Sequence, residues 1–116
     1  MSTFYLKGRD TRPTIEVYLL DPDGTAHDLT GSTAWRLHVQ VPGGTLTRDM
    51  TPDADLTTGI LRYTWLAADW TTGTAVLTTG VHRMEYEVTG PGTARLTWPN
   101  DDYDRLHVLA DIGQGA

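Results

Sequence analysis

The chain has 116 residues, enough for one domain that buries roughly two-thirds of the surface its unfolded form exposes. It contains no Cys, which excludes disulfides, thiolate metal sites and a cysteine nucleophile. The formal net charge is −6 and the 9 cations are scattered, so the composition argues against a nucleic-acid surface. No apolar run approaches the roughly 20 residues of a membrane helix, and the N-terminus is too polar for a secretory signal.

The first segment, Met1–Pro13, shows no sustained period. It carries Phe4, Tyr5 and Leu6 ahead of the polar run Gly8–Pro13. This pattern predicts an N-terminal arm over residues 1–13. Its apolar side chains either fold back on the domain or dock on a neighbouring protein.

Thr14–Leu20 carries apolar residues in both alternating sets, which predicts a strand that is covered on both sides. Asp21–Gly24 follows it with turn chemistry: Pro fixes φ and Gly accepts a positive φ. A calcium loop is the alternative, but the segment lacks a closing bidentate Glu. We therefore expect a turn, followed by a short strand over Ala26–Leu29.

Thr33–Val41 alternates cleanly between apolar and polar residues and places Trp35 on the inward side, where a buried Trp suits the centre of a core. Pro42–Gly44 is a predicted turn. Thr45–Thr51 returns as a polar strand, which we expect at the edge of a sheet.

Gly59–Trp65 is a further alternating strand, and Leu66–Trp70 is the one place where a helical turn is expected. Thr71–Thr79 has turn-like ends and a small apolar centre. It is either an edge strand or a loop that projects from the domain. The apolar residues of its centre are Ala75, Val76 and Leu77.

The segment Val81–Val108 organises the predicted fold. Its first part is a half-buried strand. Gly90–Gly92 then reverses the chain, and Pro99 ends the next strand because it has no N–H for a ladder. A last strand and a frayed tail over residues 111–116 complete the chain. The predicted inward residues are His82, Met84, Tyr86, Val88, Ala94, Leu96, Trp98, Leu106, Val108 and Ala110.

Short strands with turn signals between them and no long helical window predict an all-β, immunoglobulin-like antiparallel β-sandwich of about seven to eight strands. We expect a single domain over residues 14–110. The Cys pair of antibody domains is absent, so we expect the chain to resemble immunoglobulin domains in its strand arrangement only. The residues expected to be buried together between two sheets are Trp35, Leu37, Tyr63, Trp65, Tyr86 and Val88.

The sequence offers few candidates for catalysis. Ser2 and Ser32 are its only serines, and neither lies in a Gly-x-Ser-x-Gly pattern. The four histidines show no close pairing typical of a metal site, and His82 is predicted to be neutral and structural. We therefore expect no catalytic residues, no cofactor and no metal.

Six short segments follow one another along the chain in an order that indicates a protein family more specifically than any one segment does. They are Gly8–Pro13, Leu20–Gly24, Asp28–Thr33, Gly59–Trp65, Glu85–Val88 and Trp98–Asp101. Together they resemble the N-terminal, immunoglobulin-like domain of phage baseplate upper proteins and its stand-alone relatives in phage genomes. The resemblance spans Gly8 to about Val108. Thr71–Thr79 is extra relative to that pattern, and His82 stands where an aromatic residue is usual.

The resemblance implies a non-enzymatic structural protein of a tailed-phage virion, located in the tail, baseplate, neck or capsid surface. Its expected partners are other virion proteins and further copies of itself, with no nucleic acid and no membrane. Unpaired edges and loops can pair with another chain, so the two segments outside the shared pattern are the expected contacts. The candidate interaction residues are Phe4, Tyr5, Leu6, Ala75, Val76 and Leu77.

A carbohydrate-binding β-sandwich module is the alternative from another functional class. Such a module stacks sugars on an exposed aromatic platform. Trp70, Trp98 and Tyr103 are the residues that could supply one.

Overall fold

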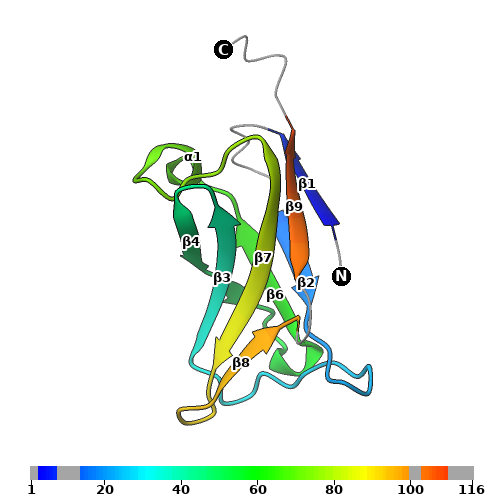
Figure 1. Ribbon diagram of the computed structural model, residues 1–116. Coiled ribbons are helices and arrows are strands. Elements are labelled where there is room, and N and C mark those ends of the chain that lie inside the picture. Colours follow the sequence, from blue (N-terminus) through cyan, green and yellow to red (C-terminus); the bar gives the residue numbers. More distant parts are fainter. Residues whose placement is uncertain (1–2, 8–13, 100–102, 110–116) are drawn as a thin grey trace.

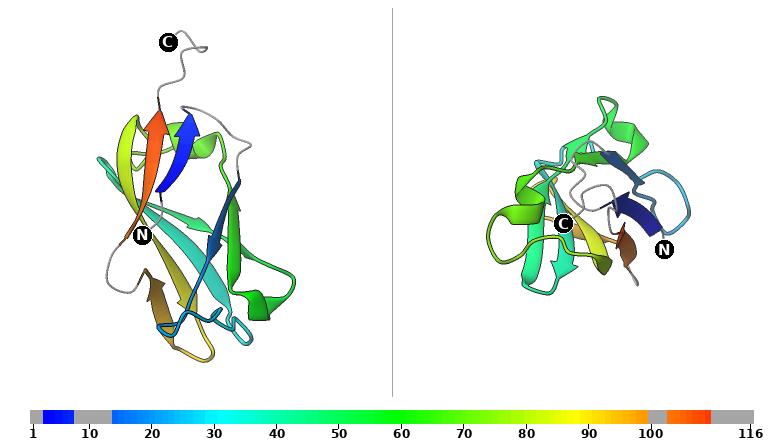
Figure 2. Two further views of the ribbon diagram at one scale, coloured as in Figure 1. Left: turned by 90° about the vertical axis from the view of Figure 1, so that its right-hand side faces the viewer. Right: turned by 90° about the horizontal axis from the view of Figure 1, so that it is seen from above.

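The computed structural model describes residues 3–7, 14–99 and 103–109. The strands of the larger sheet are β1 (Thr3–Lys7), β3 (Ala34–Val41), β4 (Gly44–Asp49), β7 (Gly80–Thr89), β8 (Arg95–Trp98) and β9 (Asp104–Leu109). The smaller sheet contains β2 (Thr14–Tyr18), β5 (Thr51–Pro52) and β6 (Ile60–Thr64). Two short helical segments, η1 (Leu56–Thr58) and α1 (Ala68–Thr71), lie in connections. The two sheets pack face to face (Figure 1 and Figure 2).

The strand order is β1-β9-β7-β3-β4 in the larger sheet, with β8 also on β7, and β2-β6-β5 in the smaller one. Nine described strands in two packed sheets form an all-β sandwich, against the seven to eight strands expected. The predicted fold class is therefore confirmed. Among the described strands, all ladders are antiparallel except that of β1 with β9.

The core lies between the two sheets and is built from the inward set of each strand. Along β3 and β7 the predicted alternation is confirmed, and Tyr63 and Trp65 meet edge to face with ring centroids 5.1 Å apart. The buried residues at the centre are Ile15, Val17, Leu37, Val39, Leu61, Tyr63, Trp65, Met84, Tyr86, Val88, Leu106 and Val108.

Trp65, rather than Trp35, is the fully buried tryptophan of this core. Trp35 packs against the core but stays half-buried. It lies near the start of β3, where its Nε1–H donates to Ser32 Oγ at 2.8 Å. The predicted central position of Trp35 is therefore wrong, because this ring sits where the sandwich opens to a loop.

Two other strand predictions need correction. Thr14–Leu20 is not covered on both sides, since Tyr18 and Leu20 are exposed. The smaller sheet packs only one face against the other layer, so the outer side of β2 meets solvent. Ala26–Leu29 forms no strand and contributes a single bridge between Leu20 and Ala26.

β7 is the longest strand and has two partners along one edge. Its second half pairs with β8 and its first half with β9, so β8 and β9 follow each other along β7. Pro99 ends β8 as predicted. Leu96 is exposed, against the prediction, because β8 is an edge strand whose only described ladder is with β7. Ala94 was also expected to face inward but is exposed, because it lies before β8 begins. Trp98 is buried as expected.

The predicted helical turn is α1, and a buried carboxylate joins it to both sheets. Asp69 accepts hydrogen bonds from Arg48 of β4 and from Tyr63 Oη of β6, the latter at 2.7 Å. The main-chain oxygen of Asp69 also accepts from Leu77 N–H at 2.8 Å. The connection that follows α1 is thereby fixed to the body of the domain.

Candidate docking face

Thr3–Lys7, within the predicted N-terminal arm, forms a strand of the larger sheet, which is the fold-back alternative for this part of the arm. β1 pairs in parallel with β9 from Thr3 opposite Arg105 to Lys7 opposite Leu109. The larger sheet therefore includes Thr3–Lys7, which precede the predicted domain range of residues 14–110. Residues 8–13 and 111–116, and Ala110, lie outside the described part of the chain.

The three N-terminal candidates for contact differ in exposure. Leu6 is 3% exposed and belongs to the core, and Phe4 is half-buried against it. Tyr5 is 67% exposed on the opposite side of β1. The alternation of the strand explains the split, because β1 is covered by the other layer on one face alone. Leu6 therefore packs in the core of the isolated chain, and Tyr5 is the member of the three whose side chain is open to a partner.

The second predicted contact segment packs on its own domain. It contains no strand, and Leu77 is 3% exposed in the core, while Ala75 and Val76 are half-buried. The chain there approaches the β3–β4 turn so closely that a Cβ on Gly43 would lie 1.9 Å from Thr74 O. Leu77 thus packs in the core of the isolated chain, while Ala75 and Val76 remain partly exposed.

An exposed row of side chains crosses three strands on the outer side of the larger sheet. Tyr5 lies opposite His107, and His107 lies opposite Val81. The rings of Tyr5 and His107 are 5.6 Å apart between centroids. Val81 is 58% exposed. An aromatic and an aliphatic side chain therefore lie in solvent on either side of a histidine.

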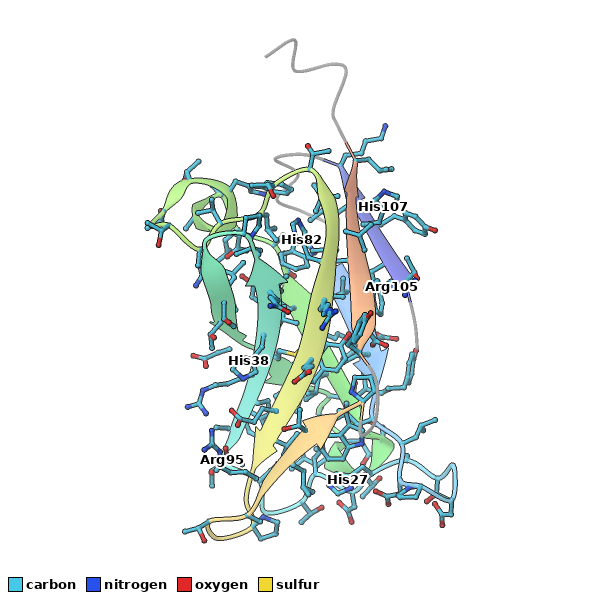
Figure 3. All side chains as sticks on the ribbon, in the orientation of Figure 1. His27, His38, His82, Arg95, Arg105 and His107 are labelled. Atoms are coloured by element: carbon cyan, nitrogen blue, oxygen red, sulfur yellow. The ribbon has the colours of Figure 1, made fainter. Side chains whose placement is uncertain are left out.

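The next row places two arginines side by side. Arg83 of β7 is directly opposite Arg105 of β9. Their guanidinium carbons lie 4.5 Å and 5.8 Å from the centroid of the Tyr103 ring. Figure 3 labels Arg105 and His107 along β9. These side chains form a basic aromatic face, which consists of Tyr5, Lys7, Val81, Arg83, Tyr103, Arg105 and His107.

The cations of this face differ from the other described cations in having no salt-bridge partner among the residues that the structure describes. Every other described arginine is paired: Arg36 and Arg95 with Glu87, Arg48 with Asp69, and Arg62 with Glu16 and Asp53. Within the described ranges, none of Lys7, Arg83 and Arg105 forms a salt bridge. Unpaired positive charge therefore gathers on one face of a chain whose net charge is −6.

An open groove of about 300 Å³ adjoins the face. It lies across the middle of the larger sheet and shares Arg83 and Tyr103 with the basic aromatic face. Its lining residues are His38, Gln40, Thr45, Arg83, Glu85 and Tyr103.

Glu87 lies near this groove, and its carboxylate is fully engaged. Burial raises its pKa, but hydrogen bonds from His38 and Arg95 outweigh that effect, so the pKa is lowered. His38 Nε2 lies 3.4 Å from Glu87 Oε1, and Arg95 Nη2 lies 2.6 Å from Oε2. A carboxylate held in its charged form in this way is not suited to act as a general acid near neutral pH.

Histidine and carboxylate groups elsewhere have structural partners. His82 is buried, and its Nε2 lies 2.6 Å from Thr78 O, while His27 Nδ1 lies 2.7 Å from Asp21. Within the described ranges, no group of three or more His, Asp or Glu side chains is placed to hold a metal ion. The same part of the chain has no helix with the length and apolar character needed to span a membrane.

The three aromatic residues that could stack on a sugar already pack against other residues of the chain. Trp98 is buried, donates from Nε1 to Leu20 O at 3.0 Å and lies against His27. Trp70 is half-buried against the core. Tyr103 lines the groove, but the Arg83 guanidinium lies over its ring. Only Tyr103 therefore lies where a ligand in the groove could touch it.

No protein-family model matches the sequence, and no curated protein matches it at a significant level. The sequence reasoning missed five residues of this face, namely Lys7, Val81, Arg83, Arg105 and His107. Their outward positions follow from strand alternation. They lie close together only because β1, β9 and β7 pair, and this pairing cannot be predicted from the local sequence.

Proposed function

We propose that this chain is a non-enzymatic structural protein of a tailed-phage virion, a β-sandwich that docks on other virion proteins. The observation that carries the docking role is the basic aromatic face. The order of turn and core segments from Gly8 to about Val108, which resembles the baseplate upper protein domain, supports the phage assignment. The immunoglobulin-like sandwich is the fold expected from that resemblance.

The composition of the face supports protein docking. Protein interfaces are enriched in Tyr and Arg, and Tyr and Arg also dominate the residues that contribute most to binding. Tyr5, Arg83 and Arg105 supply these types on one rigid sheet, with Val81 exposed among them. A sheet positions such residues with little loss of entropy on binding, which favours specific contact.

The location in the virion can be tested on particles. Phage particles whose genome encodes this chain are purified by density gradient, washed at high salt and analysed by quantitative mass spectrometry. The proposal expects the chain in intact particles at several copies per particle, as a homo-oligomeric or repeated component. Its presence in infected cells but absence from washed particles would contradict a virion role.

A carbohydrate-binding module is the second candidate, because the groove beside Tyr103 has hydrogen-bonding side chains along its walls. The guanidinium over the Tyr103 ring counts against sugar stacking on that side. A glycan array separates the two candidates. Binding that is lost in Tyr103→Ala and retained in Trp70→Ala would favour the module, and absence of any glycan signal favours the docking protein.

A further inference from the structure

Arg83 and Arg105 form a like-charge pair that no salt bridge among the described residues neutralises. They are cross-strand neighbours on β7 and β9, where like charges directly opposite each other reduce stability. Within the described ranges, no carboxylate forms a salt bridge with either one. The remaining described arginines have such partners, so the arrangement is particular to this face.

Tyr103 holds the two guanidinium groups in place without using their donors. A guanidinium over an aromatic ring is attracted to the face of the ring, while its N–H groups point outward around its edge. No hydrogen bond from Arg83 or Arg105 occurs within the described part of the chain. The planar fork of donors matches a carboxylate, which accepts two parallel bonds from it.

We propose that the basic aromatic face binds an acidic segment of a partner protein, with carboxylates on Arg83 and Arg105 and apolar side chains over Tyr5 and Val81. This inference rests on the proposed docking function and names the chemistry of the partner. Three unpaired cations attract acidic groups, and the exposed aromatic and aliphatic side chains beside them require a partner that also has apolar groups. A protein segment supplies both.

Other polyanions fit the face less well. Nucleic-acid binding uses an extended basic surface, and the net charge of −6 repels a long phosphate backbone. A second copy of the chain is also less suitable, because several of its carboxylates already accept hydrogen bonds within the fold. Asp23, Asp28 and Asp55 accept from Thr25, Thr30 and Thr57, and Asp53 accepts from Arg62.

The first test needs no partner and separates a binding role from a structural one. Arg105→Gln removes one charge of the like-charge pair. If the pair serves binding, the Tm of the variant equals or exceeds that of the wild type at low salt, and any gain shrinks as salt rises. If Arg105 instead stabilises the fold, the Tm falls at every salt concentration, and the inference is overturned.

The second test measures binding directly. The probe is a random copolymer of glutamate and tyrosine, titrated against the folded chain by fluorescence anisotropy. We expect binding that weakens with salt and drops by about tenfold or more in R83Q/R105Q, because charge-assisted hydrogen bonds are lost. The matched control is R95Q, which removes the same charge from an arginine that already pairs with Glu87. It should bind within about twofold of the wild type.

Four results would overturn the inference. They are no binding of the copolymer, equal losses in R95Q and in R83Q/R105Q, tighter binding of heparin or single-stranded DNA than of the copolymer, and self-association of the wild type that R83Q/R105Q abolishes. The last would make a second copy the occupant. Each concerns the partner's chemistry, whereas the particle analysis above tests the virion role independently.

Discussion

The carboxylate of Asp69 is fully buried and accepts a hydrogen bond from Arg48 Nε, so one ion pair joins α1 to the edge strand β4. Tyr63 and the main-chain N–H of Leu66 also donate to this carboxylate. A buried charge is tolerated only when its hydrogen bonds are satisfied, and here three donors surround it. The pair therefore fixes the end of the sandwich where the connection after α1 begins.

Asp69→Ala should lower the free energy of unfolding by about 3 kcal/mol, because it leaves Arg48 and the Tyr63 hydroxyl without their acceptor in a buried setting. Urea denaturation measures the change. Asp49→Ala is the control, since Asp49 is exposed and only loosely paired with Arg36, and it should cost less than about 0.5 kcal/mol. Equal costs for the two variants would show that the Asp69 network does not hold this end together.

The two tryptophans near the core should differ in their contribution to stability. Trp65→Ala removes a fully buried side chain and should cost about 3 to 5 kcal/mol. Trp35→Ala removes a half-buried ring and should cost about 1 to 2 kcal/mol. Both are measured by urea denaturation at the same pH. A larger loss for Trp35 than for Trp65 would contradict the assignment of Trp65 to the centre.

Alkaline pH should destabilise the fold through Tyr86. Burial first, and then the charge and hydrogen bond of Asp104, raise the pKa of Tyr86 well above its usual range. A raised pKa in the folded state means that the stabilisation is complete below the unfolded-state pKa of about 10 and is lost as pH rises above it. The free energy of unfolding should therefore fall above about pH 10, and fall less steeply in Tyr86→Phe. Identical slopes for variant and wild type would argue against this role.

His82 should be a structural residue that does not bind metal. Its Nε2 is 2.6 Å from Thr78 O, which engages that nitrogen within the fold. Zinc or nickel should leave the Tm of the wild type unchanged, and His82→Phe should cost about 1 kcal/mol from the lost hydrogen bond. A metal-dependent rise in Tm that disappears in His82→Phe would contradict this assignment.

Strand alternation predicted the inward residues of β3, β6 and β7 because a two-residue period is a local property of the chain. The same reasoning failed where burial depends on distant partners. Tyr18 is exposed because it lies on the outer side of β2, and Leu96 is exposed on the edge strand β8. Trp35 is less central than alternation predicts, because alternation gives the face of the strand on which a residue lies but not how far it lies from the end of the sandwich.

The residues of the basic aromatic face could not be grouped from the sequence either, because strand pairing brings them together. Tyr5 was a candidate from the sequence, but Arg83 and Arg105 looked like isolated solvent-exposed cations. They become a pair only because β9 runs beside β7, and Tyr5 joins them only because β1 pairs in parallel with β9. Leu6 and Leu77 were indistinguishable from contact residues until the core that receives them was known.

The most direct test of the docking account compares two tyrosines of nearly equal exposure on opposite sheets. Tyr5, on the basic aromatic face, is 67% exposed and Tyr18, on β2 of the smaller sheet, is 61% exposed. Hydroxyl-radical footprinting read by mass spectrometry reports the accessibility of both, first in the isolated chain and then in purified particles. The account predicts that both react in the isolated chain and that Tyr5 alone becomes protected in the particle. Continued reactivity of Tyr5 in the particle, or protection of Tyr18 alone, would contradict it.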